Sequence, residues 1–500
     1  MRARCLGGSG DSNRAVLNPA AAFRADRQRR GNAALPIHDV ELDFRGADTG
    51  KGRKMALKAA DFHAAAAPVI ERLKAEGLDQ RRYSDVLDGA GHQYVDLVME
   101  GGGVLGVALL GYIYVLEQAG LRFICLGGAS AGSITALALA ALDEPARAKS
   151  DALIEVVANM PMASFIDGKD DGDDDAPDFI NTMLKRPGLI KGFWKGMQIL
   201  DNLDEMMGLN RGDRFHAWLT QVLAGAGIHS TAQLRARMAT TPPGWRLRED
   251  SPQRASQLDG KAQLPALDAD KDYLCIVAAD IATETKVEFP RMAGLYWDEP
   301  EAVNPADYAR CSMSIPVFFR PFRRPLKIRD PAHLAQWCEQ AGLNDGDLRP
   351  DREPPFPPPQ ACFIDGGVLS NFPIDAFHNT YKVPSRPTFG AKLQWDDRSH
   401  EIGKLSKLIT QTFNSARHCL DYEFIRKNPD FKQLVAYIDT ADHDWLNFEM
   451  DDAGKLDLFR RGAETARAFL AGFDWDRYKA TREHLISAYA LAWQPQVVKV

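Results

Sequence analysis

Two glycine-rich turns, each between an apolar strand-like run and an apolar helical run, constrain the fold of this chain more than any other feature. The first unit begins with residues 94–99, a short run that favours a β-strand. The sequence GGGVLG at residues 101–106 interrupts this run, and a helical pattern follows until Gly120. A strand, a glycine loop and a helix are therefore predicted in this order.

The second unit repeats that order. Residues 122–126 predict a strand that runs into GASAG at residues 128–132, and residues 133–142 continue as a helix rich in alanine and leucine. Parallel crossovers are almost always right-handed, so both glycine loops should emerge side by side at the carboxyl edge of one sheet. We expect the two turns to share one crevice.

Ser130 is the candidate nucleophile of this crevice. Glycines around the serine allow a tight strand-to-helix bend that projects its hydroxyl out of the sheet. In the first turn, Gly101, Gly102 and Gly103 leave backbone N–H groups uncovered beside a helix N-terminus, which suits an oxyanion. The alternative for Ser130 is a turn needed only for packing, because GxSxG alone also matches structural turns by chance.

A dinucleotide-binding loop is the alternative for the first turn, since Gly101, Gly103 and Gly106 also fit GxGxxG. That fingerprint requires an acidic residue at the end of the second strand to hold the ribose hydroxyls. The second strand here ends in GGAS at residues 127–130. The strand end therefore favours an oxyanion loop over a nucleotide site.

Asp365 is the candidate general base. A predicted strand at residues 361–364 follows a proline-rich spacer and leads directly into Asp365-Gly366-Gly367. A carboxylate at the end of a buried strand, with glycines that let the backbone turn, is well placed to face the crevice of Ser130. The alternative is an ordinary Asp-Gly turn without a catalytic role.

The composition limits the possible classes of function. The 500 residues carry a net charge of −7, which predicts no global attraction to nucleic acid or to anionic membranes. Seven cysteines without close pairing suit a reducing compartment. Because we find neither a signal peptide nor an apolar run long enough to cross a bilayer, we expect a cytoplasmic protein with peripheral membrane contact or signal-independent export.

Three further segments bear on metal and membrane binding. The acidic loop at residues 167–178 lacks the glutamate that closes an EF-hand, and no histidines are spaced as in a zinc motif, so we expect neither a metal nor a cofactor. Lysines and aromatic residues at 185–195 fit a membrane-facing cap or a helix that covers the core. Arginines and aromatic residues at 318–329 fit contact with lipid phosphates or an exposed basic hairpin.

The rest of the chain predicts a mixture of strands and helices. Residues 273–280 have the pattern of a buried parallel strand, and residues 281–289 that of its hairpin return. Further predicted elements are helices at 209–223, 402–426 and 455–471 and strands at 388–393 and 434–438.

Taken together, the motifs resemble the patatin-like phospholipase family, in which GGGVLG-, GASAG- and DGG-type sequences stand in this order at strand ends. The resemblance extends to residues 274–289, to ARCSMSIPVFF at 309–319, to Asn371-Phe372-Pro373 and, more weakly, to 435–450. It covers roughly residues 94–473 and leaves the N-terminal extension outside.

The resemblance implies a catalytic dyad without histidine, in which Ser130 is the nucleophile and Asp365 the general base. It assigns the oxyanion hole to the backbone of Gly101, Gly102 and Gly103, and fatty-acyl esters of lipids to the substrate. Supporting glycines of the three motifs are Gly106, Gly128, Gly132, Gly366 and Gly367. Leu105 stands where the family often has a basic residue, so the resemblance does not imply phosphate recognition by the loop.

We therefore expect an α/β protein with a three-layer α/β/α patatin-like fold, a mainly parallel central sheet and helical cap insertions. The expected organisation is an N-terminal extension, partly disordered, at 1–93, a catalytic domain at 94–394, and a mainly helical C-terminal region at 395–500 packed on that domain. The expected activity is that of a serine lipid acyl hydrolase of the phospholipase A or lysophospholipase type. A catalytically silent lipid-binding or scaffold module and a dinucleotide- or flavin-binding protein stay open as alternatives.

Overall fold

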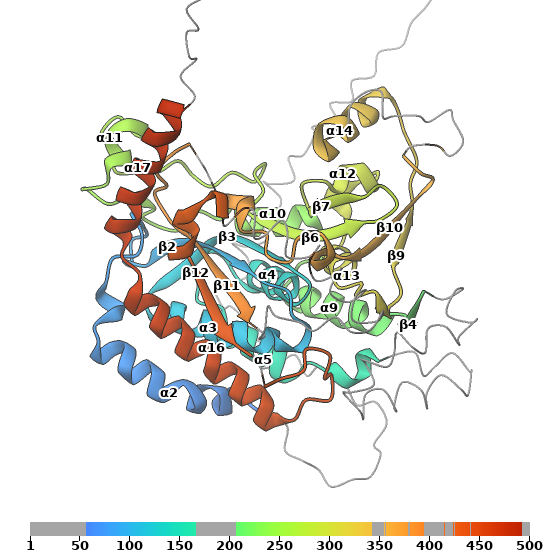
Figure 1. Ribbon diagram of the computed structural model, residues 1–500, viewed down its shortest axis with the longest axis horizontal. Helices are drawn as coiled ribbons and strands as arrows, with labels where there is room; N and C mark the ends of the chain where they lie inside the picture. The colour runs from blue at the N-terminus through green and yellow to red at the C-terminus, as the bar shows by residue number, and fades with distance from the viewer. Residues whose placement is uncertain are drawn as a thin grey trace, which may run out of the picture. The chain divides into compact units, whose positions relative to one another are not determined.

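A mixed β-sheet organises the fold and positions the site (Figure 1). The computed structural model describes residues 57–166, 207–342, 357–378, 381–394, 426–440 and 442–492, together with residues 355, 415 and 424. Within these residues, the strands of the main sheet are β1 (Val86–Leu87), β2 (Gln93–Met99), β3 (Leu121–Ala129), β5 (Arg246–Leu247), β6 (Leu274–Asp280), β7 (Thr285–Phe289), β9 (Phe322–Pro325), β10 (Gln360–Asp365), β11 (Thr388–Gln394) and β12 (Val435–Asp439). A separate small sheet pairs β4 (Gly208–Asn210) with β8 (Val317–Phe319).

The centre of the main sheet is parallel. Its hydrogen-bonded neighbours follow the order β12-β11-β2-β3-β6-β10-β9, and the pairs from β12 to β6 are all parallel. Strand β6 also pairs antiparallel with β7 and with β10, and β10 pairs antiparallel with β9. The predicted α/β fold with a mainly parallel central sheet is confirmed.

Strands β3 and β10 share one edge of β6. Because β7 pairs with residues 276–280 along one edge of β6, both other partners of β6 lie on the opposite edge. There Ala129, the last residue of β3, lies opposite Val277, and Asp365, the last residue of β10, lies opposite Ala278. Since β10 runs against β3, the carboxyl ends of the two strands meet end to end beside consecutive residues of β6.

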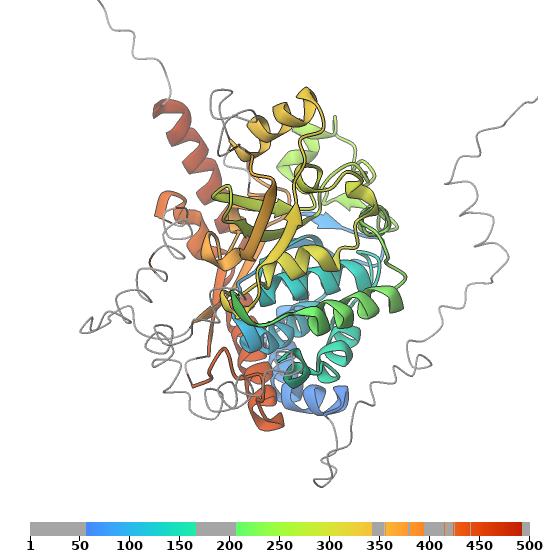
Figure 2. The ribbon, with the colours of Figure 1, turned by 90° about the vertical axis from the view of Figure 1, so that its right-hand side faces the viewer.

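Helices pack on one face of the parallel strands. Helix α4 contacts β3 and β6, α16 contacts α3 and β12, and α2 lies beside α16 in both ribbon views (Figures 1 and 2). The described helices are α2 (Ala59–Ala75), α3 (Val107–Gln118), α4 (Ala131–Leu142), α5 (Ser150–Ala158), α9 (Asp213–Gly225), α10 (Thr231–Met238), α11 (Pro252–Gln257), α12 (Ala293–Tyr296), α13 (Ala306–Ser312), α14 (Pro331–Ala341), α16 (Asp452–Gly472) and α17 (Trp475–Ala492).

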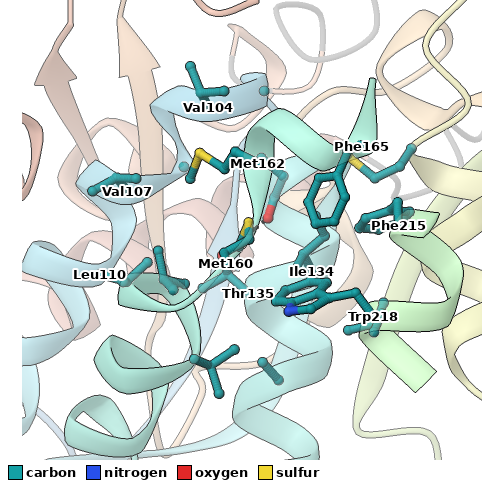
Figure 3. Close-up of a pocket in the computed structure, with 18 of the residues that line it drawn as sticks. Val104, Val107, Leu110, Ile134, Thr135, Met160, Met162, Phe165, Phe215 and Trp218 are labelled. Carbon is teal, nitrogen blue, oxygen red and sulfur yellow. Dashed lines mark hydrogen bonds between the residues drawn. The ribbon is translucent and has the colours of Figure 1, made fainter. Parts of the chain in front are cut away.

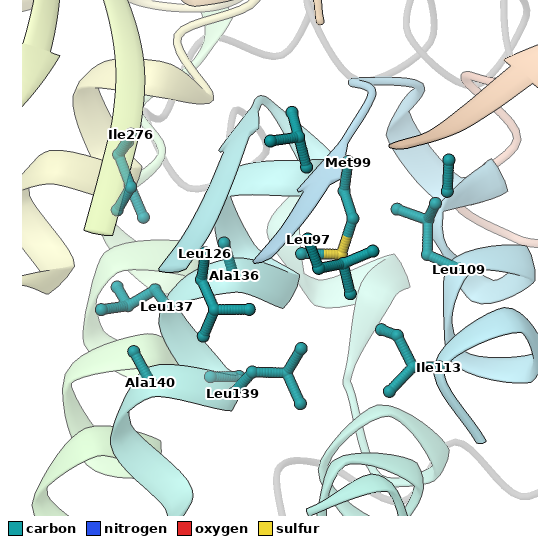
Figure 4. Packing of buried hydrophobic residues seen from close by; sticks show 14 of the residues in the cluster. Leu97, Met99, Leu109, Ile113, Leu126, Ala136, Leu137, Leu139, Ala140 and Ile276 are labelled. Carbon is teal, nitrogen blue, oxygen red and sulfur yellow. The ribbon is translucent and has the colours of Figure 1, made fainter. Parts of the chain in front are cut away.

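Helices α3 and α4 are apolar on nearly all sides, as is usual for helices that lie inside a protein. Most of their residues are buried. Leu109 and Ile113 of α3 and Leu139 of α4 pack in the cluster that also contains Met99 of β2 and Leu126 of β3 (Figure 4). This packing holds the helix that follows each glycine-rich turn firmly against the sheet.

The crossing of α3 and α16 depends on two glycines. A β-carbon at Gly462 of α16 would lie 1.8 Å from the carbonyl oxygen of Ala108, and one at Gly111 of α3 would lie 1.9 Å from that of Phe459. Backbone atoms cannot move aside as a flexible side chain can, so the two helices approach this closely only because both positions lack a side chain.

Near α9, one predicted helix is confirmed with a later start and one predicted hairpin is wrong. The helix expected at 209–223 begins only at Asp213, because Gly212 has φ +77° and the preceding residues form β4. The segment 318–329 is not a hairpin: β8 pairs with β4, whereas β9 pairs with β10 in the main sheet. The two short strands of this segment therefore belong to different sheets, a pairing that the local sequence does not reveal.

Several predictions lie outside the described residues. They concern the acidic loop at 167–178, the basic-aromatic segment at 185–195, residues 1–56 of the N-terminal extension and most of the helix at 402–426. Among the helices that are described, none is both long enough and apolar enough to cross a membrane.

The helix crossing gives a stability prediction. Gly462→Ala should destabilise the protein by about 1–3 kcal/mol or more, because the added methyl overlaps a backbone carbonyl of α3 and overpacking outweighs the gain in helix propensity. Gly472→Ala in the same helix is the matched control, since a β-carbon there meets no atom within 4 Å. Urea unfolding should show a loss only for Gly462→Ala; equal stability of the two variants would contradict the described crossing.

Candidate active site

Ser130 occupies a strained turn between β3 and α4. Its backbone has φ +51° and ψ −123°, which for a non-glycine residue costs on the order of 1–3 kcal/mol. The turn is tight because a β-carbon at Gly132 would lie 2.2 Å from the carbonyl oxygen of Met99, and one at Gly128 would lie 2.4 Å from Gly132 itself. The two outer glycines of the motif are thus required by close backbone approach.

Hydrogen bonds on both sides hold this turn in place. The N–H of Ser130 donates to Ser312 Oγ at 2.9 Å, and Ser312 Oγ donates to the carbonyl of Val277 at 2.6 Å. The carbonyl of Ser130 accepts from the N–H and from the Oγ of Ser133, at 2.9 and 2.6 Å. The hydroxyl of Ser130 lies 3.4 Å from Met313 Sδ, a weak acceptor.

Asp365 lies at the end of β10, where that strand meets β3. Its N–H donates to the carbonyl of Ser314 at 2.9 Å, and its Oδ1 accepts from the N–H of Gly367 at 2.7 Å. A β-carbon at Gly366 would lie 1.9 Å from the carbonyl oxygen of Val277, so the chain can turn away here only with glycine. The aspartate is 7% exposed and Ser130 is 3% exposed.

Two serines at the end of α13 link both candidate residues. Ser312 binds the backbone of Ser130 and Ser314 binds the backbone of Asp365, and both serines are fully buried. Sequence reasoning did not single out either serine. They belong to the ARCSMS run that carries part of the family resemblance, and nothing in that run alone indicates which backbone each serine contacts.

The glycine loop lies directly beside Ser130. A β-carbon at Gly101 would lie 2.8 Å from Ser130 Cβ. The N–H of Gly101 donates to the carbonyl of Asn371 at 3.2 Å, whereas the N–H groups of Gly102 and Gly103 have no acceptor among the described residues. The structure therefore brings the predicted loop to the predicted serine and leaves two of its three glycine N–H groups available for a ligand.

Asn371 ties the glycine loop to the turn after Asp365. Its Nδ2 donates to the carbonyl of Gly101 at 3.0 Å, and its carbonyl accepts from the Gly101 N–H. Its Oδ1 lies 2.5 Å from the positions that β-carbons at Gly101 and Gly367 would take. The only sequence signal for this role is the short NFP run that follows DGG.

An apolar pocket opens beside the site. Figure 3 shows Val107 of α3, Ile134 of α4 and Trp218 of α9 around it, together with Met160 and Phe165. Its volume is about 50 Å³. Further lining residues are Ala131, which follows Ser130, Met313, which follows α13, and three residues of the first glycine-rich turn: Gly103, Val104 and Gly106.

Other potential nucleophiles and bases near the site are not activated. Burial raises the pKa of the Cys275 and Cys311 thiols well above the ordinary value, so both stay neutral. Burial lowers the pKa of His378 to about 3, with a further contribution from Arg482, and its ring packs on Phe431. Groups of three or more residues able to hold a metal ion do not occur among the described residues.

The histidines that follow Asp365 bear on the choice between a dyad and a triad. Of the four, His400 and His418 lie outside the described residues. His378 packs among phenylalanines, and His443 Nε2 lies 3.0 Å from Asp457 Oδ2. Both described histidines are thus engaged elsewhere.

Fold and site together define the class: an α/β protein with a buried serine at a strained strand-to-helix turn, beside a triple-glycine loop. The profile of the family described as "Patatin-like phospholipase" matches residues 97–378. The chain belongs to this family. Membership supports lipid hydrolysis as its class of activity.

The individual proteins that the chain resembles share 25% or less of its sequence. The uncharacterized protein YqhO of Bacillus subtilis (strain 168) is 25% identical over 380 residues, which cover 75% of this chain and 98% of YqhO. The crystal structure of VipD from Legionella pneumophila has a TM-score of 0.34 at 14% identity, over 78% of this chain and 70% of VipD. ExoU of the type III secretion system of Pseudomonas aeruginosa, in complex with SpcU, has a TM-score of 0.28 at 14% identity, over 80% of this chain and 60% of ExoU.

The environment of His378 gives a pH prediction. Its pKa in the folded protein, about 3, lies below the ordinary 6.5, so the unfolded chain binds more protons and stability falls as the pH drops from 6.5 toward 3. His378→Gln should therefore lose less stability than the unmodified protein between pH 7 and pH 4.5 in urea unfolding. It should also keep most of the ester hydrolysis at pH 7, as should His443→Gln.

The contrary result is a folded His378→Gln protein without hydrolytic activity. That outcome would make this histidine part of a Ser-Asp-His triad.

Proposed function

We propose that this protein is a serine lipid acyl hydrolase of the phospholipase A or lysophospholipase type, acting through Ser130 and Asp365. The observation that carries the proposal is the end-to-end meeting of β3 and β10 on one edge of β6. It places Ala129, the residue before Ser130, and Asp365 opposite consecutive residues of β6, although they come from distant parts of the chain. If the turn at Ser130 served only for packing, the carboxyl end of β10 with Asp365 would not need to lie beside it.

The reaction has two steps. Asp365 accepts the hydroxyl proton as Ser130 Oγ attacks the ester carbonyl, and it gives this proton to the leaving oxygen as the tetrahedral intermediate collapses and releases the alcohol part of the lipid. Water then attacks the acyl-serine while Asp365 accepts a proton from it, and return of that proton to Ser130 Oγ releases the fatty acid. The 3.4 Å contact of the Ser130 hydroxyl with Met313 Sδ is weak, so rotation of the side chain toward Asp365 costs little.

The N–H groups of Gly102 and Gly103 are the proposed oxyanion donors. Gly101 contributes differently: its N–H is occupied by the carbonyl of Asn371, so it holds the loop at the correct distance from Ser130. Loss of one such donor costs about 2.7–4 kcal/mol of transition-state stabilisation in other enzymes. The loop is therefore nearly as important as the nucleophile.

The apolar pocket is the proposed site of the acyl chain. Its volume of about 50 Å³ is far below the roughly 300–1,000 Å³ of typical ligand pockets, so an acyl chain can enter only if lining side chains move. Met160, Met162 and Met313 supply that adaptability, because unbranched thioether side chains change conformation easily. We infer that the enzyme meets its substrate by peripheral contact with a membrane.

Substitution of the two proposed catalytic residues tests this function. Ser130→Ala should abolish the release of fatty acids from a mixed phospholipid extract and leave stability nearly unchanged. Asp365→Asn should lower turnover by orders of magnitude, because the amide keeps the shape of the side chain but cannot accept a proton. Mass spectrometry of the lipid products measures both effects and identifies the acyl position.

Two nearby residues serve as matched controls. Ser133→Ala removes a buried hydroxyl from the same turn, and Asp280→Asn alters a buried carboxylate of β6 that accepts from the N–H of Cys362 and of Ala282. Both should lower stability more than activity. If folded Ser130→Ala kept substantial activity, Ser130 would not be the nucleophile.

A further inference from the structure

The apolar pocket beside Ser130 lies between two helices that both begin at the site. Helix α3 follows the glycine loop and α4 starts directly after Ser130, so successive lining residues lie further and further from the nucleophile. On one wall, Figure 3 shows Val104, Val107 and Leu110 one after another down the pocket. On the α4 wall, intervals of three and four residues place the lining residues on one helix face: Ala131, Ile134, Thr135 and Ala138.

The deep end of the pocket lies two helical turns from the site. Ala138 follows Ala131 by seven residues, which at a rise of about 1.5 Å per residue separates the two by about 10 Å along α4. On the facing wall, Leu110 is the last residue of α3 that lines the pocket. The side chains of Ala138 and Leu110 therefore mark the deep end.

Helix α5 returns from this deep end towards the site. The carboxylate of Glu117, in the last turn of α3, accepts the N–H groups of Lys149 at 2.9 Å and of Ser150 at 2.8 Å, and so ties the start of α5 to the end of α3. From there the lining residues follow in the order Leu153, Val156, Val157, Met160 and Met162. Leu153 is thus the α5 residue nearest the deep end, and the two methionines lie nearest the site.

The two ends of the pocket differ in how far they can adapt to a ligand. At the deep end, Leu110, Ala138 and Leu153 are all buried, and their helices are held by the crossing with α16, by the sheet and by Glu117. Near the site, the lining includes methionines, whose unbranched side chains change conformation easily. A ligand can therefore widen the entrance more readily than it can deepen the pocket.

The deep end is also chemically uniform. Hydrocarbon side chains from three helices meet there, and Thr135, which lies one turn nearer the site, donates its hydroxyl to the carbonyl of Ala131 at 3.1 Å. Such a surface suits the methyl end of a hydrocarbon chain, because a polar or charged group would lose its hydrogen bonds to water without replacement.

We propose that Ala138, with Leu110 and Leu153 beside it, limits the length of the acyl chain that the pocket accepts. Each carbon adds about 1.3 Å to an extended chain, since C–C bonds of about 1.5 Å alternate in direction, so a depth of about 10 Å corresponds to roughly eight carbons. Shorter acyl groups end before Ala138, and longer ones meet its methyl group. The inference rests on the proposed function and deepens it by naming a residue that determines substrate specificity.

The test compares two alanines of α4 that differ in their relation to the pocket. Ala138→Val adds two methyl groups at the deep end. Ala140→Val adds the same groups at a buried position that does not line the pocket and lies in the cluster of Figure 4, so it is the matched control. Leu153→Ala enlarges the deep end instead, and it decides the test if Ala138→Val fails to fold.

Two assays separate this inference from the proposed function. The first measures kcat/KM for p-nitrophenyl butanoate, octanoate and dodecanoate. The second measures the Kd of hexanoate and dodecanoate by calorimetry after each substitution is combined with Ser130→Ala, so that binding is observed without turnover.

Ala138→Val should lower the dodecanoate-to-butanoate ratio of kcat/KM about tenfold or more, because a single methylene in an apolar pocket already changes discrimination by roughly 10–200-fold. Ala140→Val should change this ratio by less than about twofold, and Leu153→Ala should raise it. The binding assay should show the same preference for the shorter chain in Ala138→Val.

The remaining outcomes are distinct. If binding follows this pattern but no ester is cleaved, the hydrolase proposal is wrong and the role of Ala138 stands. If esters are cleaved but Ala138→Val behaves like Ala140→Val in both assays, or if dodecanoate does not bind, the role of Ala138 is wrong.

Discussion

The pairing of two strands with one edge of β6 is the constraint on which the site depends. In a simple parallel sheet, Ser130 and a second catalytic group would come from neighbouring strands that run in the same direction. Here β3 and β10 approach each other along the same edge and stop opposite Val277 and Ala278. Neither strand can continue along this edge, so each must turn sharply out of the sheet, and the two turns bring the candidate residues Ser130 and Asp365 to the same place.

The strain of this arrangement is offset by contacts around it. The unfavourable backbone angles of Ser130 persist because Ser312 and Ser133 bind its backbone and because α4 is packed against the sheet. The glycine loop in turn is held by Asn371, which follows the Asp365 turn in the chain. Hydrogen bonds to neighbouring segments thus hold the proposed nucleophile, the proposed base and the loop of the proposed oxyanion donors in place.

Local sequence was sufficient to predict the elements and the candidate residues but not their geometry. The alternation of strand-like, glycine-rich and helical segments predicted the ends of β2, α3, β3 and α4 to within a few residues. This was possible because tight turns require glycines, which are visible in the sequence. The direction of β10 could not be inferred, since an antiparallel and a parallel strand have the same short apolar pattern. The roles of Ser312, Ser314 and Asn371 could not be predicted, because small buried polar residues acquire their role only from partners distant in sequence.

Reaction of the native protein with a fluorophosphonate tests most directly whether Ser130 is a nucleophile activated by the surrounding residues. After brief treatment at neutral pH, intact mass spectrometry should show a single adduct, and peptide mapping should place it on the peptide that contains Ser130. Denaturing the protein before treatment should prevent the reaction, because an unfolded serine has no proton acceptor or oxyanion hole beside it. An adduct on another residue, or none on a folded protein, would contradict the account.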